Sequence, residues 1–408
     1  MTTKLLIFES IDSGHRLQHP SFILAQFSAN EFDELHLLVP SAFKSRHEEY
    51  FSQNPEQIEG AIIRYMTIEE YDYFGPEKSQ FLRPWRELRY VRAYIKINGI
   101  SHLHLDNLNR FFYSLWALKG LKVTISCIYY APYTRLVKPV QGLVRRSKFM
   151  LAVLRKKLQL KFALAKRNLN RIYILNDQWS VDYLNDSYKT TSFNYIVDPI
   201  WFPDVKAQSD PVQNSSKFHF LIFGTISKEK GIKQFLNGVA LLSKECQVRM
   251  KIHIAGRVRP NYLPELEMLL RDLKSLAPFV EVVLENRFLS AQDMANCFNR
   301  CDIVVNMNIR TQSASGVMGH AAAWGKPAIS SSTGLYGVLA KQYKLGPVVN
   351  PYNAAEVADA CRSVVAQKVA DFIPRRARKY VAERDWSVFG ETVIRGARHL
   401  VEVANGET

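Results

Sequence analysis

The chain has 408 residues, of which 47% are hydrophobic and 12% aromatic, a composition that allows a substantial buried core. Its length favours two domains over one, and no apolar run approaches the roughly 20 residues that a membrane-spanning helix needs. The chain opens on an apolar segment, KLLIFES (4–10), that we expect to be a first strand with no signal peptide before it. These properties predict a cytoplasmic protein of two domains.

The formal net charge of +16 is concentrated in one segment. Residues 107–176 contain fifteen Lys or Arg and no Asp or Glu, which leaves 39 of the 54 basic residues against 38 acidic ones elsewhere. A nucleic-acid-binding protein more often spreads its basic residues over a binding face and interleaves them with aromatic residues. The distribution therefore argues against nucleic acid and favours a local anionic partner, of which anionic lipid headgroups are the leading candidate.

Apolar runs alternate with helical patterns in the first 200 residues, which predicts an α/β domain with a parallel sheet over 1–200. After KLLIFES, the expected strands are ELHLLVP (34–40), SHLHLD (101–106), KVTISCIYY (122–130) and RIYILN (171–176).

A basic amphipathic helix is predicted over about 143–170 in the same domain. Its apolar stripe recurs at spacings of three and four residues and comprises Leu151, Leu154, Leu158, Phe162, Ala165 and Leu169. The opposite face carries Arg155, Lys156, Lys161, Lys166 and Arg167. This pattern is suited to lying on an anionic membrane, with the basic groups in the headgroup layer. The alternative is a helix packed on the core with a solvated basic face.

A second α/β domain is predicted over 218–386, after a linker at 201–217 that is rich in Pro, Ser, Asn and Asp. Its expected strands are KFHFLIFG (217–224), VRMKIHIAG (248–256), VEVVLE (280–285), CDIVVNM (301–307) and KPAISSS (326–332). Two doubly wound sheets are expected to form a cleft, with ligands beyond the carboxyl ends of the strands. Helix amino termini at those positions favour phosphate.

Six segments in the second half of the chain resemble glycosyltransferase family 4, the group 1 glycosyl transferases. VDPIWFP (Val197–Pro203) is similar to the linker signature of that family, and FGTISKEKGI (Phe223–Ile232) to the strand, loop and helix that open its second domain. KIHIAG, the region of CDIVVNM, GHAAAWGKPAI and the terminal DWSVFGETVIRG follow at family-like spacing. The resemblance implies a GT-B fold with two Rossmann-like domains facing a central cleft, and a terminal helix (387–408) that crosses back to the first domain.

The resemblance also implies retaining transfer of a sugar from a nucleotide donor, without a metal. Lys230 is then the cation for the diphosphate. The family pairs this lysine with an arginine five residues earlier, where this chain has Thr225, so Arg257 or Arg287 is a possible substitute.

The loop before the GHAAAW segment is expected to bind the donor through backbone N–H groups of Ser315, Gly316 and Val317. The family has glutamates at the positions of Gln312 and His320. Both side chains here can form hydrogen bonds, but neither carries a permanent negative charge. His320 is either a site residue or a core histidine.

In the first domain, SGHRLQH (Ser13–His19) resembles the glycine-rich loop of the family, and Gly14, His15 and Arg16 are expected at the donor. The alternative is a loop that caps the first helix. His104 and Asp106 at the end of SHLHLD, with His102, and Tyr129 or Tyr130 after the next strand, are candidate catalytic or sugar-contacting residues.

The sequence thus predicts a glycosyltransferase that moves a sugar from a nucleotide sugar to a glycan or lipid-linked acceptor, in bacterial cell-surface polysaccharide synthesis. We expect it to be peripheral on the inner face of the cytoplasmic membrane. The alternative is a non-catalytic GT-B partner or scaffold, because the carboxylates and the clamp arginine of the family are replaced. The donor, the acceptor and the oligomeric state do not follow from the sequence.

Overall fold

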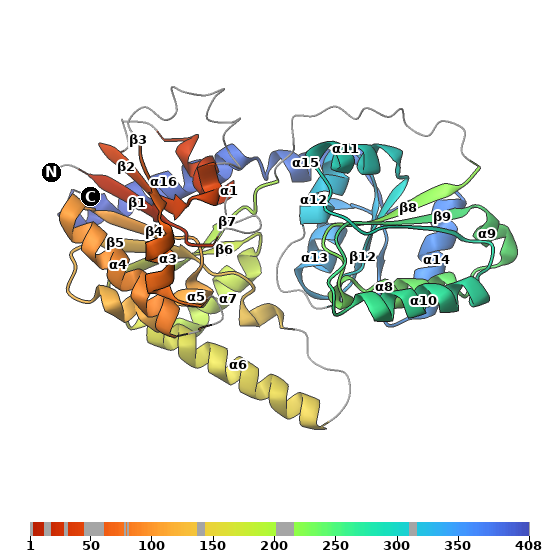
Figure 1. The fold of residues 1–408 in the computed structure, drawn as a ribbon, viewed down its shortest axis with the longest axis horizontal. Coiled ribbons are helices and arrows are strands. Elements are labelled where there is room, and N and C mark those ends of the chain that lie inside the picture. The colour runs from red at the N-terminus through yellow and green to blue at the C-terminus, as the bar shows by residue number, and fades with distance from the viewer. Residues whose placement is uncertain are drawn as a thin grey trace. The chain divides into compact units, whose positions relative to one another are not determined.

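The computed structural model divides the chain into two compact α/β units (Figure 1). The first unit comprises Met1–Thr134, Lys138–Pro199 and Trp386–Thr408, and the second comprises Arg135–Val137 and Ile200–Asp385. The structure describes residues 3–11, 18–27, 32–44, 61–76, 79, 81–136, 143–200, 216–309 and 316–407. The chain enters the second unit at Ile200 and returns to the first at Trp386.

A parallel sheet of seven strands forms the centre of the first unit, in the order β3-β2-β1-β4-β5-β6-β7. β1 lies inside the sheet, so that Leu6 stands opposite His36 on one neighbour and Leu103 on the other. The strand order reverses between β1 and β4, and such a switch point is where doubly wound sheets bind ligands. The strands are β1 (Lys4–Phe8), β2 (Glu34–Pro40), β3 (Ala61–Met66), β4 (His102–Leu105), β5 (Thr124–Ile128), β6 (Leu169–Leu175) and β7 (Phe193–Ile196).

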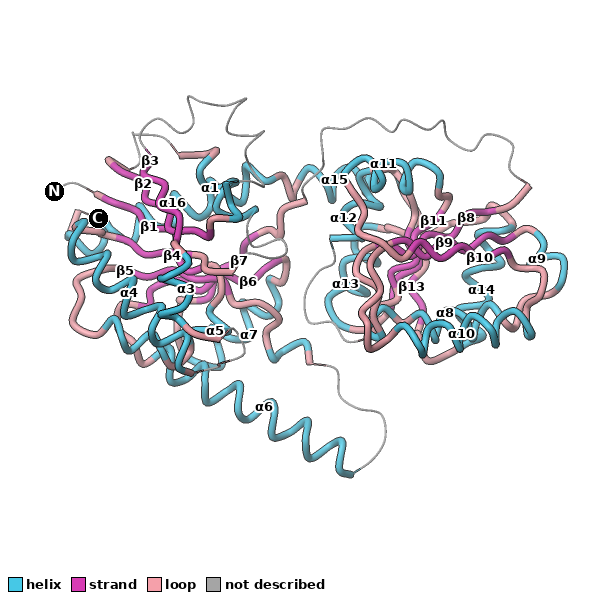
Figure 2. Tube along the Cα trace, in the orientation of Figure 1, coloured by secondary structure: helices cyan, strands magenta, loops and turns pink. Residues whose placement is uncertain are grey.

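The helices of the first unit include the last helix of the chain. α1 and α16 pack side by side against the sheet (Figure 2), and Phe389 and Val393 of α16 share a core with Phe22 of α1. The described helices are α1 (Gln18–Leu24), α3 (Ile68–Phe74), α4 (Leu82–Asn98), α5 (Leu108–Phe111), α6 (Leu143–Leu164), α7 (Gln178–Tyr188) and α16 (Trp386–Asn405), with 3-10 turns η3 (Ser114–Leu118) and η4 (Tyr133–Arg135).

The second unit repeats this plan with six parallel strands, in the order β10-β9-β8-β11-β12-β13. Here β8 is the inner strand, and the order reverses between β8 and β11. The strands are β8 (Phe218–Phe223), β9 (Met250–Ala255), β10 (Glu281–Glu285), β11 (Ile303–Asn306), β12 (Ala328–Ser331) and β13 (Val348–Val349).

Both faces of the second sheet are covered, which explains the nearly continuous apolar runs of its strands. Phe220 and Ile222 of β8 belong to one core cluster, and Leu221 between them belongs to the cluster on the other face. The described helices of this unit are α8 (Ile232–Val239), α9 (Lys244–Val248), α10 (Leu263–Leu276), α11 (Ala291–Arg300), α12 (Gly316–Ala323), α13 (Gly334–Tyr343), α14 (Ala354–Val365) and α15 (Pro374–Ala382), with the 3-10 turn η5 (Lys228–Lys230).

The predicted fold class, two Rossmann-like parallel sheets, is confirmed. All ten predicted strands are present, and three further strands were not predicted. β3 alternates between half-buried and exposed residues as an edge strand does, β7 has four residues, and β13 has two. The predicted linker at 201–217 lies almost entirely outside the described residues.

The basic helix is shorter than predicted. α6 ends at Leu164, and Leu169, which the pattern placed on the helix, is the first residue of β6 and is buried. No helix in the described part of the chain is long and apolar enough to span a bilayer.

Gly390 tests the packing of α16 on α1. A Cβ at this position would lie 2.4 Å from the Phe22 carbonyl oxygen. Alanine normally stabilises a helix interior relative to glycine, by roughly 0.5–1 kcal/mol. We expect Gly390→Ala to do the opposite and to lower the free energy of unfolding by roughly 1–3 kcal/mol, as overpacking does.

Calorimetric unfolding measures this effect. The control is Glu391→Ala, which removes only an exposed ion pair with Arg395 and is expected to cost roughly 0.5 kcal/mol or less. A stabilised Gly390→Ala protein would contradict the tight packing of α16.

Candidate active site

Three glycines hold the loop after β8 close to its neighbours. A Cβ on Gly256 would lie 2.0 Å from the carbonyl oxygen of Gly224, and Gly224 itself has a φ of 96°. A Cβ on Gly231, whose φ is 71°, would lie 2.1 Å from the carbonyl oxygen of Met307. Only glycine tolerates these conformations and approaches without strain. The backbones that follow β8, β9 and β11 are therefore drawn together at the switch point.

The ammonium group of Lys230 lies within this cluster. Its Nζ donates to the Phe223 carbonyl oxygen at 3.0 Å, and a Cβ on Gly224 would lie 3.6 Å from it. Burial lowers the pKa of Lys230 to about 8, and no carboxylate among the described residues offsets that shift. A partly desolvated cation without an anionic partner is well suited to receive an anion.

The first turn of α12 approaches the same point. Cγ2 of Val317 lies 3.9 Å from the position of a Cβ on Gly224, and Gly316 before it is exposed. The first N–H groups of a helix have no acceptor within the helix, and the helix dipole adds positive potential there. Lys230 and the start of α12 thus converge on Gly224. Gln312 and Ser315 lie outside the described residues.

Of the possible partners of Lys230, Arg287 is already paired with carboxylates. Its guanidinium donates to both oxygens of Asp293 at 2.8 Å and lies 2.5 Å from a Glu285 oxygen. These carboxylates raise the pKa of Arg287 and compensate its charge, which argues against the predicted role at a diphosphate. Thr225 and Arg257 are exposed in the loops after β8 and β9.

His320 is half-buried on α12, with its ring 5.9 Å from the ring of Phe298 in the core. This contact places one side of the imidazole against apolar packing. A role for His320 at the donor stays a prediction.

The polar site of the first unit is a cluster of His19, Asp106 and Tyr130 at its switch point. Nδ1 of His19 lies 2.7 Å from Asp106 Oδ1, and the Tyr130 hydroxyl donates to Asp106 Oδ2 at 3.1 Å. The rings of His19 and Tyr130 are nearly parallel, and His19 also packs on Phe389. The three residues come from α1, the end of β4 and the segment after β5.

The electrostatic environment favours the charged form of His19. Burial opposes that charge, but the Asp106 carboxylate, through its charge and its hydrogen bond, outweighs burial and raises the pKa. Asp198 and Glu9 contribute in the same direction. His19 therefore holds a proton more firmly than a free histidine does.

His104 and Tyr129, two predicted catalytic residues, are core residues. The His104 Nδ1 lies 2.8 Å from Ser126 Oγ, and burial lowers its pKa to about 4. Burial also lowers the pKa of the neighbouring His102, whose ring lies between Thr124 and Ser126. Tyr129 is fully buried. His104 lies within β4, whereas Asp106 and Tyr130 follow the ends of β4 and β5 and meet His19 there.

His19 was not predicted as a site residue, although it ends the SGHRLQH segment. The signal that identifies it is spatial, because Asp106 lies 87 residues away in sequence. Gly14, His15 and Arg16 of the same segment lie outside the described residues.

A buried ionic network fixes the end of β1 in the same unit. Arg110 donates to both oxygens of Glu87 at 2.8 and 2.9 Å and to Ser10 Oγ at 2.8 Å. Arg83 donates to the same carboxylate at 2.9 Å. Glu9 accepts the backbone N–H groups of Ser10 and Ile11 at 2.7 Å. The loop after β1 therefore begins from a rigid, charge-compensated base.

The predicted basic helix keeps an exposed apolar stripe. Leu151, Leu154, Leu158 and Phe162 are 42–68% exposed, whereas Leu160 on the other side is buried. The alternative interpretation, in which this apolar stripe packs on the core, is therefore wrong for these four residues.

The basic residues of the helix region are not all on its surface. Arg155, Lys161 and Arg167 are exposed and Lys156 is half-buried. Lys166 is buried, which lowers its pKa, and its ammonium lies over the Trp116 ring at 6.0 Å.

Three side chains in the second unit have the spacing of metal ligands. Ligand atoms of His253, Glu285 and Cys297 lie within 4.8 Å of one another. Glu285 is already paired with His253 and Arg287, and burial raises the pKa of Cys297 to about 12, which disfavours the thiolate. The absence of a metal requirement stays a prediction.

Residues 217–367 match the family model for glycosyl transferases group 1. The second unit is a group 1 glycosyl transferase domain. The matched range runs from the residue before β8 to the residues after α14 and includes Gly224, Lys230 and α12. The predicted family is thus confirmed for the second unit, and the candidate donor site lies inside the matched range. No curated protein sequence matches the chain.

Solved structures match nearly the full length of the chain and show a GT-B fold. A glycosyltransferase from Rickettsia africae has a TM-score of 0.65 at 13% identity, with 98% of this chain and 99% of that chain covered. HepE from Anabaena, solved with UDP and glucose, has a TM-score of 0.64 at 13% identity, with coverages of 97% and 99%. A trehalose-phosphate synthase from Burkholderia vietnamiensis has a TM-score of 0.67 at 12% identity, with 99% of both chains covered.

The His19–Asp106 pair of this glycosyltransferase can be tested by titration. Asp106→Asn removes the carboxylate but leaves His19 buried, so the pKa of His19 is expected to fall below its ordinary value of 6.5. Imidazole NMR signals followed against pH measure the change. The control is Ser126→Ala, which contacts His102 and His104 and is expected to leave His19 unchanged. An unaltered His19 in Asp106→Asn would show that the carboxylate does not set its charge.

Proposed function

We propose that the protein transfers a sugar from a nucleotide-sugar donor to a glycan or lipid-linked acceptor, with the donor diphosphate bound by Lys230 and the first turn of α12. The observation that carries this proposal is the desolvated ammonium of Lys230 beside Gly224, at the switch point of a group 1 domain. The UDP and glucose bound to HepE, a protein of similar fold, support this class of donor.

The chemistry needs positive potential where the bond to the diphosphate breaks. Negative charge develops on the leaving oxygen, and preorganised cations and N–H groups lower the energy of that state. Lys230 is held by the Phe223 carbonyl and cannot be stabilised by a described carboxylate, so an arriving diphosphate becomes its counter-ion. Binding is then expected to raise the pKa of Lys230 again.

We assign the acceptor to the first unit. The His19–Asp106 pair can hold a proton near neutral pH, and Tyr130 adds a hydroxyl at the same point. Retention of configuration and independence from metal follow only from the family resemblance and belong to the proposal.

The exposed stripe of α6 supports a site of action at a membrane. Its apolar residues are flanked by Arg155 on one side and Lys161 on the other, and residues 107–176 carry no acidic side chain. Lipid binding by such a helix gains from apolar burial and from attraction to anionic headgroups. Synthesis of a cell-surface polysaccharide at the inner face of the cytoplasmic membrane is consistent with this arrangement.

Lys230 and Lys228 form a matched pair for testing the donor site. Lys228 lies in the same turn, but it is exposed and paired with Glu265. We expect Lys230→Ala to weaken nucleoside diphosphate binding by roughly 10- to 100-fold, as the loss of a charged hydrogen bond does. Lys228→Ala should bind within about twofold of wild type. Calorimetry across the common nucleoside diphosphates measures both effects.

The donor site should also depend on pH. The depressed pKa of Lys230 means that its charge is present below about pH 8 and is lost as the pH rises through that value. Diphosphate affinity should therefore fall above pH 8 in wild type, and Lys230→Arg, which keeps its charge, should flatten that fall. If Lys230 variants bound every nucleoside diphosphate as tightly as wild type does, the donor would bind elsewhere. Tight binding without transfer to any acceptor would favour the non-catalytic alternative.

Vesicle sedimentation tests the membrane contact. Leu154→Asp with Leu158→Asp should abolish most binding to vesicles of phosphatidylglycerol and phosphatidylcholine, because two exposed apolar anchors become charged. Phe288→Asp changes an even more exposed apolar residue of the second unit and is the control. Equal sedimentation of the double variant and wild type would exclude α6 as the membrane contact.

A further inference from the structure

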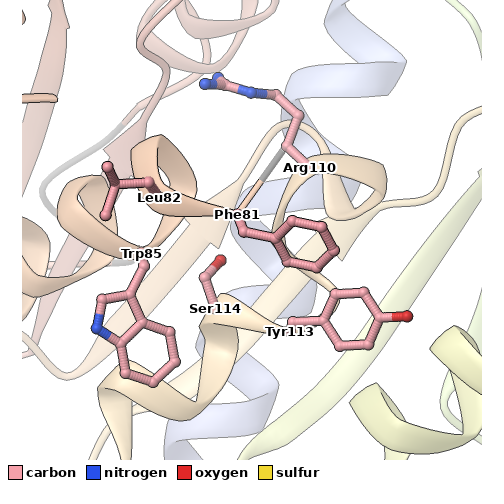
Figure 3. Close-up of a pocket in the computed structure, with 6 residues that line it drawn as sticks. All are labelled: Phe81, Leu82, Trp85, Arg110, Tyr113 and Ser114. Atoms are coloured by element: carbon pink, nitrogen blue, oxygen red, sulfur yellow. The ribbon is translucent and has the colours of Figure 1, made fainter. Parts of the chain in front are cut away.

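An apolar pocket lies on the first unit (Figure 3). It has a volume of about 290 Å³, near the lower end for small-molecule sites. The rings of Phe81 and Tyr113 lie side by side in it, 5.6 Å apart. We call it the aromatic pocket, and its lining residues are Phe81, Leu82, Trp85, Arg110, Tyr113 and Ser114.

The aromatic pocket continues into the α6 stripe through ring contacts. The Tyr113 ring lies 5.6 Å from the ring of Phe162, which is the last residue of the stripe. Leu158, one helical turn earlier, is 58% exposed. The stripe from Leu151 to Phe162 is about 16 Å long at 1.5 Å per residue. Together they form an apolar track from the basic surface of α6 into the pocket.

The large apolar side chains along this track are unusually exposed to solvent. Phe81 is 67% exposed, Leu82 52% and Trp85 40%, whereas large apolar side chains gain free energy when they are buried. Contiguous exposed apolar surface of this kind marks an interaction site. The basic flanks, Arg155 and Lys161, select an anionic amphiphile over a neutral apolar partner.

The inner end of the pocket is close to the polar site. Arg110 lines the pocket and belongs to α5, whose N-cap residue Asn107 directly follows Asp106. Asp106 and Arg110 are four residues apart in sequence, and Arg110 lies 3.8 Å from Glu9, one of the carboxylates that act on His19. Arg110 also contacts Ser10 and Glu87, so the pocket wall is fixed by the buried ionic network.

We propose that the aromatic pocket binds the hydrocarbon tail of a lipid-linked acceptor. The tail lies between the α6 stripe and the pocket, and the polar head lies toward His19, Asp106 and Tyr130. The acceptor is therefore an anionic lipid with a glycan or phosphate head and not a free sugar. This assignment rests on the proposed function, because it names the acceptor class of that same transfer.

Photolabelling tests the location of the tail. The probe is a short prenyl phosphate with a diazirine near the end of its tail, bound to the full-length protein and cross-linked by light. Labelled peptides are expected to contain Phe81–Trp85 or Tyr113–Ser114. Phosphatidylglycerol with a diazirine in one acyl chain should label α6 and leave the pocket peptides unlabelled. Labelling confined to α6 by the prenyl probe, or equal labelling of the pocket by both probes, would overturn the proposal.

Variants test the same point by activity and binding. Trp85→Asp, and separately Phe81→Asp, should reduce pocket labelling and transfer to a lipid-linked acceptor about tenfold. Ile97→Asp is the control, because Ile97 is also on α4 and 82% exposed but lies outside the pocket. Nucleoside diphosphate affinity should be unchanged in all three variants. Normal transfer to a lipid-linked acceptor by both pocket variants would overturn the proposal.

A failure of the proposed function itself gives a different result. In that case the wild-type protein binds no nucleoside diphosphate in calorimetry, whatever the prenyl probe labels. Normal diphosphate binding with transfer only to water-soluble glycans overturns the acceptor assignment and leaves the donor site intact.

Discussion

The close approach of Gly256 to the Gly224 carbonyl oxygen constrains the whole donor side of the molecule. Because Gly256 has no side chain, the segments after β8 and β9 can lie this close together, and Gly224 in the loop after β8 has a positive φ. That turn brings Lys230 back over the Phe223 carbonyl and next to the first turn of α12. Backbone geometry therefore places the cation.

The two units treat charge at their switch points in opposite ways. In the second unit a lysine is desolvated without a described carboxylate, which makes its charge available to an incoming ligand. In the first unit Arg110 and Arg83 both donate to Glu87, and Arg110 also lies 3.8 Å from Glu9, so removal of Glu87 would leave Arg83 without the carboxylate that it contacts. The first arrangement is suited to binding an anion, and the second to holding a loop in place.

Apolar pattern was sufficient to predict the fold, because fully covered parallel strands read as continuous apolar runs. β3 escaped prediction because an edge strand with half-exposed residues lacks such a run. Lys230 was predicted from its distance to Gly224 in sequence. His19 was not, because its partner Asp106 is brought to it only by the β1–β4 pairing. Likewise, the local sequence did not indicate that Asp293 neutralises Arg287, or that Leu169 belongs to a strand and not to the helix.

The burial of His102 and His104, whose rings are both hydrogen-bonded to Ser126, has a consequence for acid stability. Burial lowers the pKa of both imidazoles in the folded protein. The unfolded chain therefore binds protons at these histidines near pH 6.5, whereas in the folded unit His104 is protonated only near pH 4. Their contribution to folding therefore weakens as the pH falls below 6.5. His19, with its raised pKa, contributes in the opposite sense, and that contribution is lost as the pH rises through its folded value. The histidines of the first unit thus favour a bounded range of pH near neutrality.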